Sequence, residues 1–107
     1  MTSFQNNYDE LEKIIYENGL RIKALHFHKD LDLMLIVLNN KKTLHRNISE
    51  FPRLQSASLA ELENYELIGE GTGVHWPDPD EDLSLKGFLK MELQHSFAME
   101  IQTLNAL

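Results

Sequence analysis

The sequence predicts an α+β fold: a small antiparallel sheet with a short helix, flanked by an N-terminal and a C-terminal helix. Two runs of strand character, residues 20–27 and 31–38, follow each other across a short polar gap, and such neighbours form an antiparallel hairpin. Apolar residues at three- and four-residue spacing before residue 19 and after residue 84 indicate helices at both ends. We therefore expect a three-stranded meander and a return strand between these helices.

The first helix is expected over residues 7–18. Asn7 and Glu10 have the spacing of an N-cap residue and its third-position acid, and Gly19 stands where a glycine often ends a helix. The apolar residues that recur at helical spacing are Tyr8, Leu11, Ile14 and Ile15. Together these signals predict a short helix before the sheet.

The three strands of the meander differ in their expected burial. Alternation in residues 20–27 predicts a strand with one buried face. The residues expected on that face are Leu20, Ile22 and Ala24. Residues 33–38 are apolar throughout, which is typical of a central strand covered on both faces. A polar turn at residues 39–42 then leads into a third strand at residues 43–48.

The next segment predicts a helix followed by the return strand. Pro52 marks a break, and Ser58 and Glu61 form a capping box that begins a helix at residues 58–65. Residues 66–70 have strand character, and we expect residues 74–76 to pair beside them.

The last helix is expected from about Ser84 onwards and is long for so small a domain. It carries one broad apolar stripe: Leu85, Phe88, Leu89, Leu93, Phe97, Ile101 and Leu104. The small sheet is too short to cover this stripe. Five of its residues are therefore candidate interface residues: Phe88, Leu93, Phe97, Ile101 and Leu104.

Composition restricts the class of protein. A chain of 107 residues fits a single domain spanning residues 1–107, and 42% hydrophobic with 25% charged residues is globular composition. Cysteine is absent, which excludes disulfides and thiol chemistry. We expect a soluble cytoplasmic protein without a membrane span, because no signal sequence is visible and no apolar run approaches about 18 residues.

Charge is distributed unevenly along the chain. The formal net charge of −7 opposes general affinity for nucleic acid, because phosphate contacts need a surplus of Lys and Arg. Residues 20–53 carry seven Lys and Arg against three acids, whereas residues 61–82 carry eight acids and no Lys or Arg. A single basic cluster comprises Lys41, Lys42, His45, Arg46 and Arg53, without interleaved aromatic residues. Direct binding of nucleic acid is therefore not expected.

A candidate binding site surrounds the acidic loop at residues 77–82. Its residues are His75, Trp76, Asp78, Asp80, Glu81 and Asp82. Trp76 and His75 could stack on or hydrogen-bond a ligand; alternatively Trp76 fills the core while His75 bonds a loop carboxylate. The loop acids could bind a hard cation, or could be solvated and favour the N-terminus of the next helix.

Metal and cofactor sites are not expected elsewhere. An EF-hand is excluded, because counting from Asp78 the sixth position is Leu83 and the twelfth is Leu89, where glycine and glutamate are required. His26 and His28 alternate on one strand face, but two imidazoles without a third ligand do not make a metal site.

Catalytic chemistry is not indicated by the sequence. None of the serines has the context of a nucleophile elbow or an SxxK motif, and the glycines at residues 69–73 lack the features of a phosphate-binding loop. We therefore do not expect an enzyme.

The chain contains Gly73-Val-His-Trp-Pro77, followed by Asp80-Glu-Asp-Leu-Ser84 and Gly87-Phe-Leu89. Further upstream stand Phe51-Pro-Arg-Leu54 and Ala57-Ser-Leu-Ala-Glu-Leu62. This series resembles a small prokaryotic family known as domain of unknown function 2442. One departure from its pattern is leucine at position 59, where the family usually has proline, and either residue can begin a helix.

The resemblance implies a small α+β fold with a three-stranded meander, a short helix and a return strand. It covers residues 20–89 and leaves an N-terminal helical extension, residues 1–19, and a C-terminal helical tail, residues 90–107. The family has no established activity. Some members carry a helix-turn-helix, which suggests transcriptional roles, and some are encoded beside small toxins, which suggests antitoxin roles.

Three hypotheses for the function follow. The leading one is a protein-interaction module, antitoxin-like, in which the acidic section or the apolar tail engages a basic or hydrophobic partner. The first alternative is a homodimeric structural or regulatory domain whose tail helices pack on each other. The second alternative is a small-ligand or metal binder at His75, Trp76 and the acidic loop.

Overall fold

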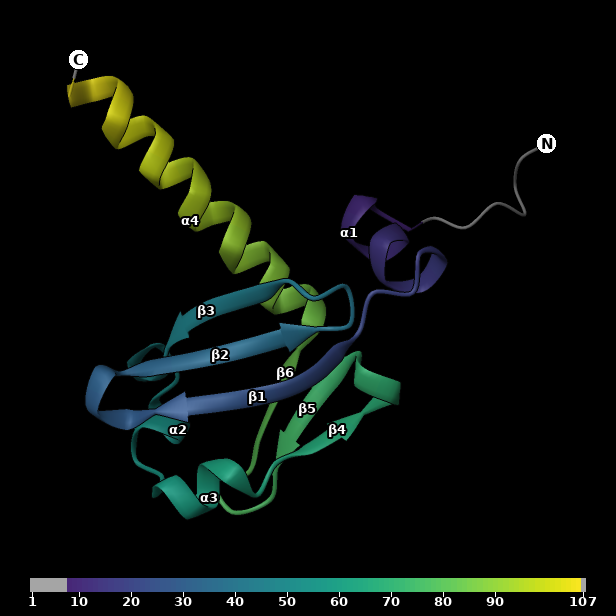
Figure 1. Ribbon diagram of the computed structural model, residues 1–107, viewed down its shortest axis with the longest axis vertical. Coiled ribbons are helices and arrows are strands. Elements are labelled where there is room, and N and C mark those ends of the chain that lie inside the picture. Colours follow the sequence, from purple (N-terminus) through teal and green to yellow (C-terminus); the bar gives the residue numbers. More distant parts are fainter. Residues whose placement is uncertain (1–7, 107) are drawn as a thin grey trace.

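The computed structural model describes the backbone of residues 8–106 and the side chains of residues 8–96. Within that part the chain forms two three-stranded antiparallel sheets with helices around them (Figure 1), which confirms the α+β fold. The strands of the first sheet are β1 (Ile22–His28), β2 (Leu33–Leu38) and β3 (Thr43–Asn47); those of the second are β4 (Glu66–Ile68), β5 (Gly73–Trp76) and β6 (Glu81–Ser84). The α-helices are α1 (Glu10–Glu12), α2 (Pro52–Gln55), α3 (Leu59–Glu63) and α4 (Leu85–Ala106).

The first helix begins later than expected. Its N-cap is Asp9, whose carboxylate accepts a hydrogen bond from the Glu12 amide at 2.8 Å while the Glu12 side chain accepts one from the Asp9 amide at 3.0 Å. This capping box replaces the predicted Asn7 and Glu10 pair, and Asn7 lies outside the described residues. The helix continues as a π turn, η2 (Lys13–Glu17), and Gly19 follows it at a φ of 77°. The glycine therefore ends the helix in the left-handed conformation, as predicted.

The predicted hairpin is present, but a β-bulge changes which side chains of β1 face the core. Ile22 pairs with Leu38 and Ala24 pairs with Val37, so the register shifts by one residue between them. Beyond this shift Leu25 is buried and Ala24 faces outward, which corrects the expected burial of Ala24. The extra residue of a bulge reverses the alternation that an uninterrupted strand would have.

The central strand β2 is covered on one face only, which corrects the expectation of two buried faces. Met34, Ile36 and Leu38 are buried in the core. The alternate side chains Leu33, Leu35 and Val37 are half-buried and do not belong to the core cluster. In Figure 1 no other element crosses in front of β1, β2 and β3. The continuous apolar run in the sequence therefore did not reveal that only one face of β2 is covered.

The return strand belongs to a second sheet. β4 pairs with β5 as predicted, and β5 also pairs with β6, which occupies part of the expected acidic loop and the expected helix start. β6 was missed because three of its four residues are polar; only Leu83 packs against the core. Helix α2 was also missed, since Pro52 was taken as a break although proline is favoured in the first turn of a helix.

Both sheets, η2 and helices α2, α3 and α4 share one hydrophobic core. Trp76 and Phe88 are its largest fully buried side chains, contributed by β5 and α4. The Trp76 indole Nε1 donates a hydrogen bond to the Leu62 carbonyl at 2.9 Å, which satisfies its polar atom inside the core. Phe27 of β1 packs edge-on against the Trp76 ring, with centroids 6.4 Å apart. These contacts join the second sheet and α3 to the first sheet.

Gly71 is required where the turn between β4 and β5 meets β1. Its φ is +95°, and a Cβ at this position would lie 2.6 Å from the Ile22 backbone oxygen. Any side chain would therefore be strained by the left-handed conformation and would also push against the backbone of β1.

Replacing Gly71 by alanine is expected to lower the free energy of unfolding by about 3 kcal/mol, because both penalties apply. Gly19→Ala is the matched control: Gly19 also has a positive φ, but nothing lies within 4 Å of its would-be Cβ. That variant should lose only about 1 kcal/mol. Urea unfolding of both variants measures the difference, and equal losses would contradict the contact with β1.

Candidate functional site

The outer face of the second sheet carries a row of three ionisable side chains. His75 lies on the central strand β5, and its cross-strand neighbours are Glu66 on β4 and Asp82 on β6. Since side chains of a strand alternate between faces, His75 points outward while its neighbours Val74 and Trp76 point into the core. The antiparallel register thus brings together residues that are up to 16 positions apart in the sequence.

His75 and Asp82 form a close pair. The ring Nδ1 lies 2.5 Å from the Asp82 Oδ1. This hydrogen bond raises the pKa of His75 above its ordinary value of 6.5; desolvation lowers the pKa, and the negative charges of Asp82, Glu66 and Asp80 raise it further. The side chains of His75 and Asp82 are 31% and 69% exposed, so water screens the pair.

The arrangement orients an imidazole but supplies little else for chemistry. Asp82 bonds the Nδ1 atom of His75, which leaves the Nε2 atom of the same ring as the one that could exchange a proton with solvent or a ligand. Within residues 8–96 no hydroxyl or amine is hydrogen-bonded to this ring. In the same part of the chain no three His, Asp or Glu side chains gather closely enough to hold a metal ion.

Trp76 is not available to a ligand, which corrects its place among the candidate binding residues. Its side chain is fully buried and bonded to the Leu62 carbonyl, so the structure has the core packing that was the alternative interpretation. The same interpretation had His75 bonding a loop carboxylate, and Asp82 is that carboxylate.

The acidic candidates do not converge on one point. Asp78 accepts a hydrogen bond from the Asn64 amide at 3.4 Å, and the Asp80 carbonyl accepts one from Arg53 at 2.6 Å. Glu81 accepts a hydrogen bond from the backbone amide of Asp82 at 3.0 Å. These hydrogen bonds are made with different partners, so Asp78, Asp80 and Glu81 do not share a ligand position. The loop also leads into a strand, so it does not flank a helix N-terminus as expected.

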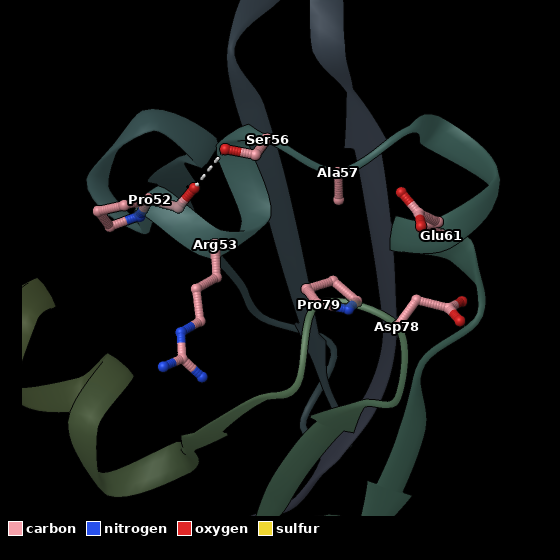
Figure 2. A pocket seen from close by; sticks show the side chains of 7 residues that line it. All are labelled: Pro52, Arg53, Ser56, Ala57, Glu61, Asp78 and Pro79. Carbon is pink, nitrogen blue, oxygen red and sulfur yellow. Dashed lines mark hydrogen bonds between the residues drawn. The ribbon is translucent and has the colours of Figure 1, made fainter.

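A shallow groove of about 440 Å³ lies between α2, α3 and the turn that follows β5 (Figure 2). It brings together residues of two segments that carry the family resemblance, 51–54 and 57–62, and the turn residues that follow Pro77. The lining residues are Pro52, Arg53, Ser56, Ala57, Glu61, Asp78 and Pro79. The sequence pattern indicated these segments but not their meeting, because residues 52–61 and 78–79 are distant in the chain.

The polar groups of this groove serve the fold. Ser56 donates a hydrogen bond to the Pro52 carbonyl at 3.2 Å, and Glu61 accepts one from the Ser58 amide at 2.9 Å. Arg53 donates to the Asp80 carbonyl, which fixes the turn against α2. The groove is consistent with a tight structural corner in which α2, α3 and the β5–β6 turn hold one another.

The interface candidates divide into three groups. Phe88 is 1% exposed and packs edge-on against Phe51 at 6.2 Å, so its assignment to an interface is corrected. Leu93 is 47% exposed and stays a candidate. The side chains of Phe97, Ile101 and Leu104 lie outside the described residues.

The basic cluster predicted from the sequence is divided in the structure. Arg46 pairs with Glu50 at 3.4 Å, whereas Arg53 lies on α2 and approaches the Asp80 carboxylate at 4.0 Å.

Within the described residues, no helix is both long enough and apolar enough to cross a membrane.

Replacing Asp82 by asparagine is expected to lower the pKa of His75, because the hydrogen bond to the carboxylate is the largest cause of its rise. A raised pKa in the folded state stabilises the protein most below pH 6.5, and this contribution is lost as the pH rises through the folded value. Titration of the His75 ring by NMR measures the shift, and Asp80→Asn is the control with a smaller effect. An unchanged pKa in the Asp82 variant would contradict the pairing.

Comparisons with known proteins agree with this fold. A crystal structure of a protein of unknown function from Rhodospirillum rubrum is similar over 68% of this chain and 88% of that chain, with 29% identity and a TM-score of 0.59. An NMR structure of an uncharacterized protein from Chromobacterium violaceum is similar over 84% and 85%, with 20% identity and a TM-score of 0.61. No curated protein matches the chain. The model of the family "Protein of unknown function (DUF2442)" matches residues 22–93, and the chain therefore belongs to that family.

Proposed function

We propose that this chain is a protein-interaction module that engages its partner through α4. The single observation that carries the proposal is that α4 leaves the body of the protein. Leu85 and Phe88 at its start are fully buried, and Leu89 and Met91 pack partly against the core. Two residues later Leu93 is 47% exposed, and the helix continues to Ala106 in a direction away from both sheets (Figure 1).

The base of α4 is firmly anchored, so the helix has a defined direction. Lys86 forms ion pairs with Asp9 at 2.9 Å and with Glu12 at 3.3 Å, which tie α4 to the N-terminal helix. The Ser84 hydroxyl accepts a hydrogen bond from the Gly87 amide at 2.9 Å, as a helix N-cap does. A segment that is held at its base loses less entropy on binding than a free one.

The projecting part of α4 has the composition of a docking helix. Thirteen residues follow Leu93 within the helix, which corresponds to a length of about 20 Å. An isolated helix of this length is marginal in water, because helices gain most of their stability from packing an apolar face. In the sequence, the spacing from Leu93 to Phe97, Ile101 and Leu104 is four, four and three residues. Helices that bind in hydrophobic grooves carry their apolar anchor residues at this spacing.

Removing the projecting part is expected to abolish assembly without unfolding the body. A chain that ends after Glu92 retains Met91, the last residue among the described side chains that packs against the core. Its melting temperature should stay close to that of the full chain, while light scattering and co-purification from the native host should show that a self-associated or heterologous complex is lost. A 12.4 kDa monomer without any bound partner, for the full chain and the truncated chain alike, would overturn the proposal.

An antitoxin-like role, in which the acidic section binds a basic protein, is a second candidate. The observation that favours it is that the acids of residues 61–82 are poorly neutralised by the rest of the described chain. Of these acids, only Asp80, with Arg53 at 4.0 Å, and Asp82, with His75, form ion pairs within residues 8–96. Exposed acids that form no ion pair within their own molecule steer association with a positive surface.

For this second candidate, Glu63→Gln with Glu70→Gln should weaken binding of a captured basic partner, and the weakening should shrink as salt is raised. Glu10→Gln is the matched control, since Glu10 is an exposed acid outside the acidic section and pairs with Lys13. Equal binding by all three proteins at low salt, measured by calorimetry, would rule the acidic section out as the contact surface.

A further inference from the structure

The outer face of the β1–β2–β3 sheet is an open surface with an apolar centre. We call it the open face; its residues are Ala24, His26, His28, Leu33, Leu35, Val37, Thr43, His45 and Asn47. Leu33, Leu35 and Val37 form a central stripe, and Leu35 has His26 on one side and His45 on the other. An antiparallel sheet with one face in water normally places polar residues on that face, so an aliphatic stripe here indicates a missing cover.

The size of the open face matches the projecting part of α4. A six-residue strand such as β2 is about 20 Å long, which equals the length of the helix beyond Leu93. Three strands spaced about 4.8 Å apart span about 10 Å, which is the diameter of a helix with its side chains. One helix laid along β2 would therefore cover the stripe from end to end.

The charges of the two surfaces are complementary. The open face contains three histidines and no acid, and Lys41 and Lys42 lie at the turn between β2 and β3. The chain from residue 91 onward contains two acids, Glu92 and Glu100, and no Lys or Arg. Beyond Leu93 the helix has Glu100 as its one acid and no Lys or Arg, so it suits a surface that has no acid and has two lysines at one end.

A groove already exists where such a helix would enter. It has a volume of about 370 Å³ and lies between the open face and the part of α4 that passes β3. Leu33, Thr43 and His45 line it from the sheet, and Glu92 and His95 line it from the helix. A second helix placed in this groove would contact both the sheet and the neighbouring α4.

The helix of the same molecule cannot provide this cover. α4 is continuous from Leu85 to Ala106 and runs past the edge of the sheet at β3 instead of across it (Figure 1). Residues 88–106 contain neither glycine nor proline, so the sequence offers no site for a sharp reversal. A helix of matching length and charge must therefore come from another molecule.

We infer that the partner is a second copy of this chain, and that the two copies exchange α4 helices, each laying the part beyond Leu93 along the open face of the other. This inference rests on the proposed function of α4 and names its binding surface. The exchange is reciprocal about a two-fold axis, so it forms the same contact twice and closes the assembly at a dimer.

The first test substitutes the stripe while leaving the core intact. Leu33→Thr with Leu35→Thr should weaken dimerisation of the full chain at least tenfold, as measured by sedimentation equilibrium, because apolar area is lost from the centre of the contact. Leu67→Thr with Ile68→Thr is the matched control, since both residues are exposed strand residues of the other sheet. Melting temperatures of both double variants show that the fold is retained.

The second test uses the absence of cysteine from the chain. A His26→Cys chain is mixed with a Gln102→Cys chain of different mass and oxidised mildly. The exchange predicts a covalent heterodimer, because His26 lies on the open face and position 102 lies in the projecting helix. Cross-linking of Gln102→Cys only to itself would overturn the inference and indicate that the α4 helices pack on each other.

The outcomes also separate this inference from the proposed function. If truncation after Glu92 abolishes assembly but the stripe variant assembles like the control, α4 is the interaction helix and the open face is not its receptor. If the full chain is a 12.4 kDa monomer at all concentrations, the exchange is overturned, and only the co-purification experiment decides on the role of α4.

Discussion

The buried indole of Trp76 is the contact on which the arrangement of the two sheets depends. It extends from the second sheet, donates its one hydrogen bond to the Leu62 carbonyl of α3, and packs against Phe27 of the first sheet. Loss of a fully buried tryptophan typically costs about 3–5 kcal/mol, a large fraction of the stability of a small domain. A second contact between the sheets lies at Gly71, where a Cβ would stand 2.6 Å from the Ile22 backbone oxygen, so only glycine fits between the β4–β5 turn and β1.

Both sheets direct one face toward this shared core, so each has an outer face that does not contribute to the core. On the second sheet that face carries the Glu66, His75 and Asp82 row, in which His75 pairs with Asp82. On the first sheet the corresponding face has an aliphatic stripe at its centre.

Local signals in the sequence were reliable where their physical cause is local. The capping box of Ser58 and Glu61 begins α3 in the structure, since both hydrogen bonds are made within one helical turn. The hairpin of β1 and β2 also follows from adjacent runs of strand residues. By contrast, β6 is too short and too acidic to be recognised alone, and it exists because β5 offers it a partner edge.

The sequence by itself determined the α+β class, the first hairpin and the start of α3, because periodicity, caps and turns act over a few residues. It also offered core packing for Trp76 and a carboxylate partner for His75, but only beside a ligand-binding alternative. Only the tertiary structure decided that Trp76 is enclosed, that Ala24 faces outward after a bulge, and that β2 is covered on one side. Those outcomes depend on which distant segments pack together, because a residue is buried by its tertiary neighbours and not by its spacing along the chain.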